Sequence, residues 1–75
     1  MTWMTVESKM FTAVACDAAE QSLYLRFTSG DVYRYFEVPA EVCQAFLDSD
    51  SKGRFFLAHI RDRFRYRRLA KPRAA

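Results

Sequence analysis

The stretch that most constrains the fold is Gly30 to Pro39, where a run of β-branched and aromatic residues lies between a turn glycine and a proline. β-Branched and aromatic residues are typical of strands. Glycine supports tight turns, and proline cannot continue in the middle of a sheet. The residues before this stretch predict strands, and those after it predict helices. We therefore expect residues 30–39 to form the last central strand and the connection into a helical half.

The residues on either side of Gly30 predict a β-hairpin. Apolar and polar or aromatic residues alternate over Ser22–Thr28, the pattern of a strand with one buried face. A three-residue loop that ends in a left-handed glycine is a common hairpin connection, and Thr28-Ser29-Gly30 fits it. A two-residue loop at Ser29-Gly30 is the alternative, and it shifts the register by one residue.

The two loops differ in the side chains that face the core. The three-residue loop pairs Leu25 with Tyr33 and Leu23 with Tyr35, so both tyrosines join the leucines. The two-residue loop buries Arg34 instead, and burying an unpaired guanidinium is costly. We therefore predict the three-residue loop. The opposite face of the hairpin then carries Tyr24, Arg26, Arg34 and Phe36.

The other segments complete an α+β fold. We expect an antiparallel meander of three to four strands, followed by two short helices packed on one face and a basic extended C-terminal tail. The further strands are expected at Thr2–Val6 and Phe11–Asp17, and the helices at Ala40–Asp48 and from Lys52 to about Arg61. Ser51 is the expected N-cap of the second helix. Residues 1–69 are predicted to form a single domain, with a disordered tail at 70–75.

Charge divides the chain into two parts. Residues 1–51 hold three basic and eight acidic residues, a net charge of −5, whereas residues 52–75 hold nine basic and one acidic, a net charge of +8. This asymmetry points to an anionic partner for the C-terminal third, the alternative being a tail that is only solvated. The sequence has neither a signal-peptide pattern nor a long apolar run, so we expect a cytoplasmic protein without membrane contact.

Three groups of residues are candidates for binding an anion such as RNA. On the hairpin face named above, aromatic rings can stack on bases and guanidinium groups can hold phosphates, although such alternation is also typical of a solvated face or a dimer contact. At the start of the second helix, Ser51-Lys52-Gly53-Arg54 could cradle a phosphate, or simply cap and pack the helix. The tail offers Arg61, Arg63, Arg65, Tyr66, Arg67 and Arg68.

Catalysis and metal binding have little support. The chain has one histidine, His59, and no carboxylate pair or nucleophile motif beside it. Cys16 and Cys43 lack metal-ligand spacing. We therefore expect no enzyme activity, metal or cofactor. We also expect both cysteines to be free thiols in a reducing cytosol rather than a disulfide.

Several short motifs together resemble the KTSC domain family, a module named for the C-terminus of some lysyl-tRNA synthetases and also found as a stand-alone bacterial protein. The resemblance covers nearly everything from Val6 to Leu69. It rests on Leu23-x-Leu25-x-Phe27, Gly30, Tyr33-x-Tyr35, Val38-Pro39, Ser51-x-Gly53, Phe55-Phe56, Ile60 and Phe64-x-Tyr66-Arg67. The sequence departs from the family pattern at Ala15-Cys16, where a Gly-Tyr pair is expected, and at Leu57, where an Asn is expected.

The resemblance implies a small non-catalytic binding module, and the synthetase association suggests RNA as the ligand by analogy. We therefore expect binding of tRNA or single-stranded RNA through the three groups above, and no small-molecule substrate. The alternative is a protein–protein interaction module, or a homodimer, that uses the same sheet face.

Overall fold

The structure is a computed structural model that describes residues 2–70. Its elements, in chain order, are β1 (Met4–Thr5), β2 (Phe11–Asp17), β3 (Ser22–Phe27), β4 (Val32–Tyr35), α1 (Ala40–Asp48), α2 (Lys52–Phe55), the π-helical turn η1 (Phe56–Ile60) and β5 (Tyr66–Ala70). The predicted α+β architecture is confirmed. Within these residues, no helix is long and apolar enough to cross a membrane.

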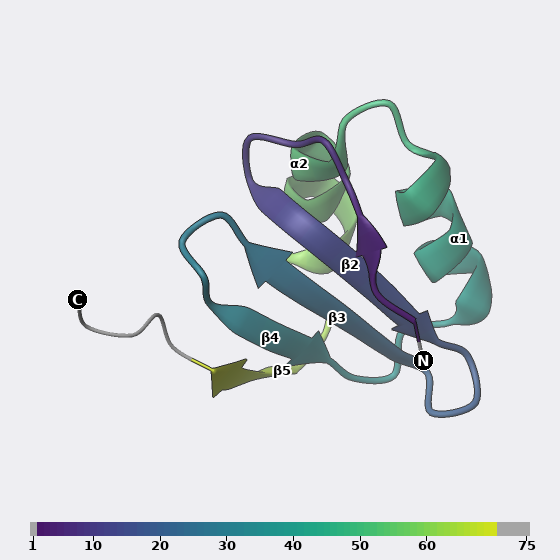
Figure 1. Cartoon of the computed structure of the whole chain (residues 1–75). Helices are drawn as coiled ribbons and strands as arrows, with labels where there is room; N and C mark the ends of the chain where they lie inside the picture. Colours follow the sequence, from purple (N-terminus) through teal and green to yellow (C-terminus); the bar gives the residue numbers. More distant parts are fainter. Residues whose placement is uncertain (1, 71–75) are drawn as a thin grey trace.

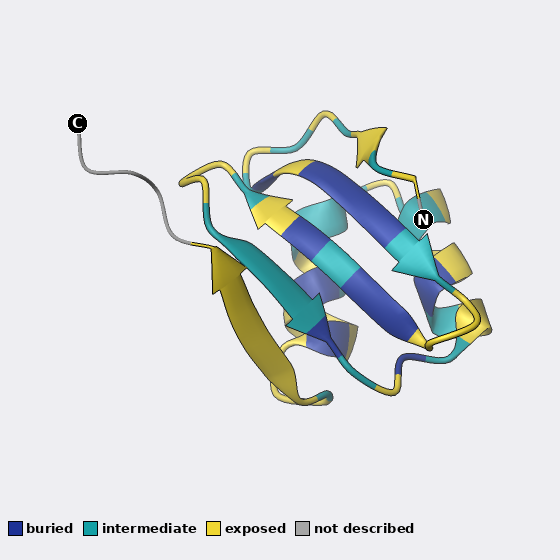
Figure 2. Ribbon diagram, turned by 60° about the horizontal axis from the view of Figure 1, so that its bottom comes forward, coloured by how far each residue is buried: buried dark blue, intermediate teal, exposed yellow. Residues whose placement is uncertain are grey.

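The sheet has five antiparallel strands in the order β1-β2-β3-β4-β5. The helices lie behind β2 and β3 and leave the other face of the sheet open (Figure 1). The chain returns from η1 to add β5 beside β4, so part of the predicted extended tail is a fifth strand. β5 is exposed along its whole length (Figure 2). Ala70 is its last residue, and the rest of the predicted disordered tail, 71–75, lies outside the described residues.

The hairpin between β3 and β4 has the predicted three-residue loop. Gly30 has a φ of 98°, a left-handed conformation that glycine adopts without steric cost. The Phe27 N–H donates to the Asp31 carbonyl at 2.9 Å, and the Gly30 N–H donates to the Phe27 carbonyl at 2.9 Å. Leu25 pairs with Tyr33 in the resulting register. The tyrosines of β4 therefore face the helices, and Arg34 faces the open side.

The core lies between the sheet and the helices and is rich in phenylalanine. Phe11 of β2 packs edge-on against Phe46 of α1 and Phe56 of η1, at ring-centroid distances of 5.8 and 5.4 Å. A bulge follows Phe11 in β2. Because the bulge resets the strand's alternation, Phe11 and Val14 both reach the core.

The helical half follows the sequence prediction with one difference. α1 has the predicted bounds, and the Ser51 side chain accepts a hydrogen bond from the Arg54 N–H at 3.3 Å as the N-cap of α2. The second half of the predicted helix is π-helical, since the Arg61 N–H donates to the Phe56 carbonyl five residues earlier, at 2.8 Å. Isolated π-helical turns are rare and are frequent at functional sites.

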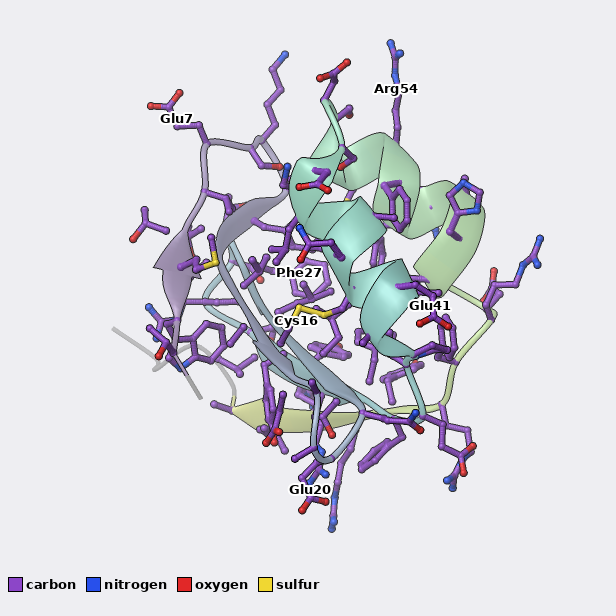
Figure 3. The ribbon with its side chains drawn as sticks, turned by 90° about the vertical axis from the view of Figure 1, so that its right-hand side faces the viewer. Glu7, Cys16, Glu20, Phe27, Glu41 and Arg54 are labelled. Carbon is purple, nitrogen blue, oxygen red and sulfur yellow. A yellow bond between two sulfur atoms is a disulfide. The ribbon has the colours of Figure 1, made fainter. Side chains whose placement is uncertain are left out.

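The prediction of free thiols is wrong, because Cys16 and Cys43 form a disulfide. The bond joins β2 to α1 inside the domain (Figure 3). The two Cα atoms lie 6.3 Å apart, within the range that a disulfide spans. The sequence could not show this proximity, because it arises only when α1 packs across β2. Free thiols would have supported the expected location in a reducing cytosol, and a disulfide does not.

Candidate functional site

A row of arginine and aromatic side chains crosses the open face of the sheet. We call it the arginine–aromatic row. Its members, in spatial order, are Arg26, Trp3, Tyr24, Arg34, Phe36 and Arg65. Each member contacts the next through a cation–π or an edge-to-face contact. The row therefore extends from the N-terminal segment across the central hairpin to the residue just before β5.

The first part of the row is built around Trp3. The Arg26 guanidinium carbon lies 5.1 Å from the centroid of the Trp3 ring, and the Trp3 and Tyr24 rings meet edge-on at 6.3 Å. Ala13 and Ala15 of β2, opposite Arg26 and Tyr24 in the sheet register, are buried. Their small side chains leave room for an aromatic side chain on this face. The N-terminal segment thereby brings an indole ring beside the hairpin.

Arg34 is the centre of the row. Its guanidinium carbon lies 5.7 Å from the Tyr24 ring centroid and 4.6 Å from that of Phe36. Its Nε donates a hydrogen bond of 2.9 Å to the Oγ of Ser22, which is buried. This bond fixes the guanidinium plane between the two rings, so the arginine is held in place before any ligand arrives. Arg65 adds a second cation at 5.7 Å from the Phe36 ring.

Positive charge gathers where β4 and β5 lie side by side on the open face. Arg34 and Arg67 lie directly opposite each other in the β4–β5 register, and like charges in such positions destabilise a sheet. Among residues 2–70, the one ion pair joins Arg68 to Asp31, at 3.9 Å. An anion bound across β4 and β5 would relieve this repulsion. The geometry thus favours a negatively charged ligand on the open face.

At the start of α2, where a phosphate cradle is predicted, the residues take part in capping and packing. The Lys52 ammonium donates to the Ser49 carbonyl at 2.7 Å, at the end of α1. A Cβ on Gly53 would meet the Met10 side chain at 3.7 Å, so the glycine lies against a neighbouring segment. Arg54 extends away from the body of the domain (Figure 3). None of the three joins the arginine–aromatic row.

The basic residues of the predicted tail are divided between the two faces of the sheet. Arg65 belongs to the row, and Arg67 lies on the same open face, opposite Arg34. Tyr66 lies on the helix side, with ring centroids 5.3 Å from Tyr33 and 5.5 Å from Tyr35. Arg61, Arg63 and Arg68 lie outside the row and are exposed.

Trp3 is the member of the row that sequence reasoning missed. An indole at the end of a short edge strand was the available signal, but only the packing of β1 on β2 places it beside Tyr24. His59 is exposed and packs on Phe55 at a ring distance of 4.7 Å. Within the described part of the chain, no three His, Cys, Asp or Glu residues gather in a possible metal site.

A small α+β module with helices on one face of an antiparallel sheet and a cationic, aromatic row on the other is the class of protein that these features define. The family model of the KTSC domain matches residues 7–64, and the chain belongs to that family. The crystal structure of a KTSC domain protein from Yersinia pestis superposes with a TM-score of 0.89 at 29% identity, covering 92% of this chain and 97% of that one.

Relatives by sequence are of two kinds. A protein from Tsukamurella paurometabola is 48% identical over 60 residues, which cover 80% of this chain and 90% of that protein. A lysine–tRNA ligase from a Nostoc species is 34% identical over 64 residues, which cover 85% of this chain but only 11% of the ligase. The domain therefore occurs both in small proteins of similar length and as a minor part of a much larger enzyme.

Proposed function

We propose that the chain is a non-catalytic module that binds single-stranded RNA across the open face of its sheet. The single observation that carries the proposal is the continuous arginine–aromatic row. Sheet-based RNA modules use the same two kinds of group, aromatic rings that stack on bases and cations that hold the backbone. The row places three aromatic rings and three arginines side by side, so bases can stack on the rings while the arginines contact the backbone phosphates.

The arrangement favours a single strand over a duplex. Bases stack on aromatic rings and on guanidinium planes only when they are unpaired. Arg34 lies between Tyr24 and Phe36, and Ser22 holds its guanidinium plane. An unpaired base can therefore stack on this guanidinium, or displace it and stack on a neighbouring ring. The opposed pair Arg34 and Arg67 is the natural place for a backbone phosphate, because the anion offsets their mutual repulsion.

The relatives supply a second line of support. A region similar to this chain forms part of lysine–tRNA ligases, enzymes whose name includes a tRNA. By analogy, a single-stranded region of a tRNA is a candidate ligand for this module. The analogy concerns the ligand class only, since the chain matches about a tenth of the ligase.

Binding of a fluorescently labelled single-stranded RNA, followed by anisotropy at several salt concentrations, tests the proposal. Tyr24→Ala and Phe36→Ala should each weaken binding by about 1–3 kcal/mol, the contribution of one stacked base. Replacing Arg34 and Arg67 together with Gln should lower the slope of affinity against salt by about 0.7 for each phosphate that the variant no longer neutralises. Arg54→Gln is the matched control, because Arg54 points away from the domain.

Equal binding by the wild type and by the Tyr24 and Phe36 variants would contradict the proposal and leave only nonspecific capture by exposed arginines. Absence of binding at low salt would favour the alternative, a homodimer or protein contact through the same face. That alternative predicts a sedimentation coefficient that rises with protein concentration in the wild type and stays at the monomer value in the Phe36→Ala variant.

A further inference from the structure

A second candidate site lies on the helix side of the sheet, opposite the arginine–aromatic row. It is a groove of about 490 Å³ between η1 and strands β4 and β5. Its lining includes Phe27, Tyr33, Tyr35, Tyr66, Arg61 and Asp62. Pockets that hold small ligands usually have volumes of about 300–1,000 Å³, with apolar walls and a few polar groups. The groove has that size and that composition.

Three tyrosine rings form one wall of the groove. The Tyr33 and Tyr66 centroids are 5.3 Å apart with an interplanar angle of 36°, and Tyr35 and Tyr66 are 5.5 Å apart at 35°. Tyr66 is 60% exposed, and Leu57, which also lines the groove, is 50% exposed. The domain therefore leaves an aromatic surface and a leucine uncovered in this groove. An exposed aromatic surface of this kind suits a flat aromatic ligand.

Two charged side chains provide the polar groups of the groove. Arg61 and Asp62 both line it, and in residues 2–70 neither takes part in an ion pair. Asp62 has a φ of 65°, a left-handed conformation that is uncommon for residues other than glycine and is frequent at functional sites. The groove therefore contains a cation and a carboxylate that do not form an ion pair with each other.

We propose that this groove binds a free nucleoside monophosphate. Its base would stack on the tyrosine wall, its ribose hydroxyls would donate to Asp62 and its phosphate would lie at Arg61. Each contact has a chemical reason: aromatic rings stack on bases, a carboxylate accepts hydrogen bonds from ribose hydroxyls and a guanidinium binds phosphate. Because this groove and the row lie on opposite faces of the sheet, the proposal is independent of RNA binding by the row.

Two-dimensional ¹H–¹⁵N NMR of the full chain tests the site. We would titrate the protein with AMP, GMP, CMP and UMP, and expect saturable shifts at Tyr33, Tyr66 and Arg61 for at least one of them. The nucleoside without its phosphate and the 2′-deoxynucleotide should each bind about tenfold more weakly, as expected for loss of a hydrogen bond to a charged group. Absence of saturable shifts in the groove with all four nucleotides overturns the proposal.

Two variants separate a binding role from a structural one. Asp62→Gly permits the left-handed backbone and removes the carboxylate, so it should abolish the preference for ribose over deoxyribose. Arg61→Gln should abolish the preference for nucleotide over nucleoside, whereas Arg54→Gln should change neither. A ribose preference that survives in Asp62→Gly, or a phosphate preference that survives in Arg61→Gln, contradicts the assignment.

Discussion

The two faces of the β3–β4 hairpin share one backbone but have opposite chemistry. On the helix side, Leu25 and Tyr35 are buried within the apolar and aromatic core. On the open side, Arg34 lies between aromatic rings and has no carboxylate partner among the described residues. The same strand therefore stabilises the fold with one set of alternate residues and presents arginine and aromatic side chains on the open face with the other.

The largest effect should come from the helix-side face. Tyr35 is 4% exposed and packs edge-on against Phe56 at 5.7 Å. Tyr35→Ala should therefore lower the free energy of unfolding by about 3–5 kcal/mol, as for other large aromatic truncations in cores. Tyr24→Ala, on the open face of the neighbouring strand, should cost much less. Urea unfolding of the two variants compares the faces directly, and equal losses would remove the distinction.

The disulfide should stabilise the helix-side packing by a similar amount. Cys16 and Cys43 are 27 residues apart in sequence, and closing a loop of that size contributes about 3–4 kcal/mol in the chain-entropy model. We expect the double variant Cys16→Ser, Cys43→Ser to unfold at a clearly lower temperature. Adding a reducing agent should lower the unfolding temperature of the wild type but not that of the variant. An unchanged wild type would contradict the assigned bond.

High pH should weaken the helix-side face selectively. Burial, reinforced by the neighbouring Tyr66 and Tyr33, raises the pKa of Tyr35 from 10.0 to about 12. The folded state therefore holds this proton more tightly than the unfolded state, so the stabilisation is complete below pH 10 and is lost as the pH rises from 10 to 12. The loss should reach about 3 kcal/mol at most. Tyr35→Phe should lack this component of the alkaline loss, which unfolding experiments at about pH 9 and pH 11.5 can measure.

A substitution in the turn at Gly30, which sets the register of the hairpin, should have the smallest of these effects on stability. Gly30→Ala forces a Cβ into a left-handed backbone and should cost about 1 kcal/mol or more. The register depends on this turn, because a shift of one residue would exchange Arg34 and the tyrosines between the faces. An unchanged unfolding temperature in this variant would show that the loop tolerates other conformations.

The features that can be predicted from the sequence depend on local chemistry. The register of the hairpin follows from one glycine and the cost of burying Arg34, and the bounds of α1 follow from Pro39 and an apolar stripe. The features that were missed depend on contacts between distant segments. β5 pairs with β4 although two helices separate these strands in the sequence. The alternating Arg63, Arg65 and Arg67 are also typical of an extended, solvated tail.

The candidate site shows the same division. Strand alternation alone places Tyr24, Arg34 and Phe36 on one face, and they do form the centre of the row. Trp3 and Arg65 reach the row only through the packing of both edges of the sheet. Phosphate binding around Lys52 stays a prediction; in the structure the Lys52 ammonium donates to the Ser49 carbonyl at the end of α1.

The fluorescence of Trp3 can test the central claim, that the open face binds single-stranded RNA. Trp3 is the single tryptophan of the chain and lies in the row beside Tyr24 and Arg26. Titration with an unlabelled single-stranded RNA should quench Trp3 fluorescence to saturation, with weaker binding in Phe36→Ala. RNA that binds by anisotropy while Trp3 emission stays constant would contradict the claim, because binding would then occur away from the row.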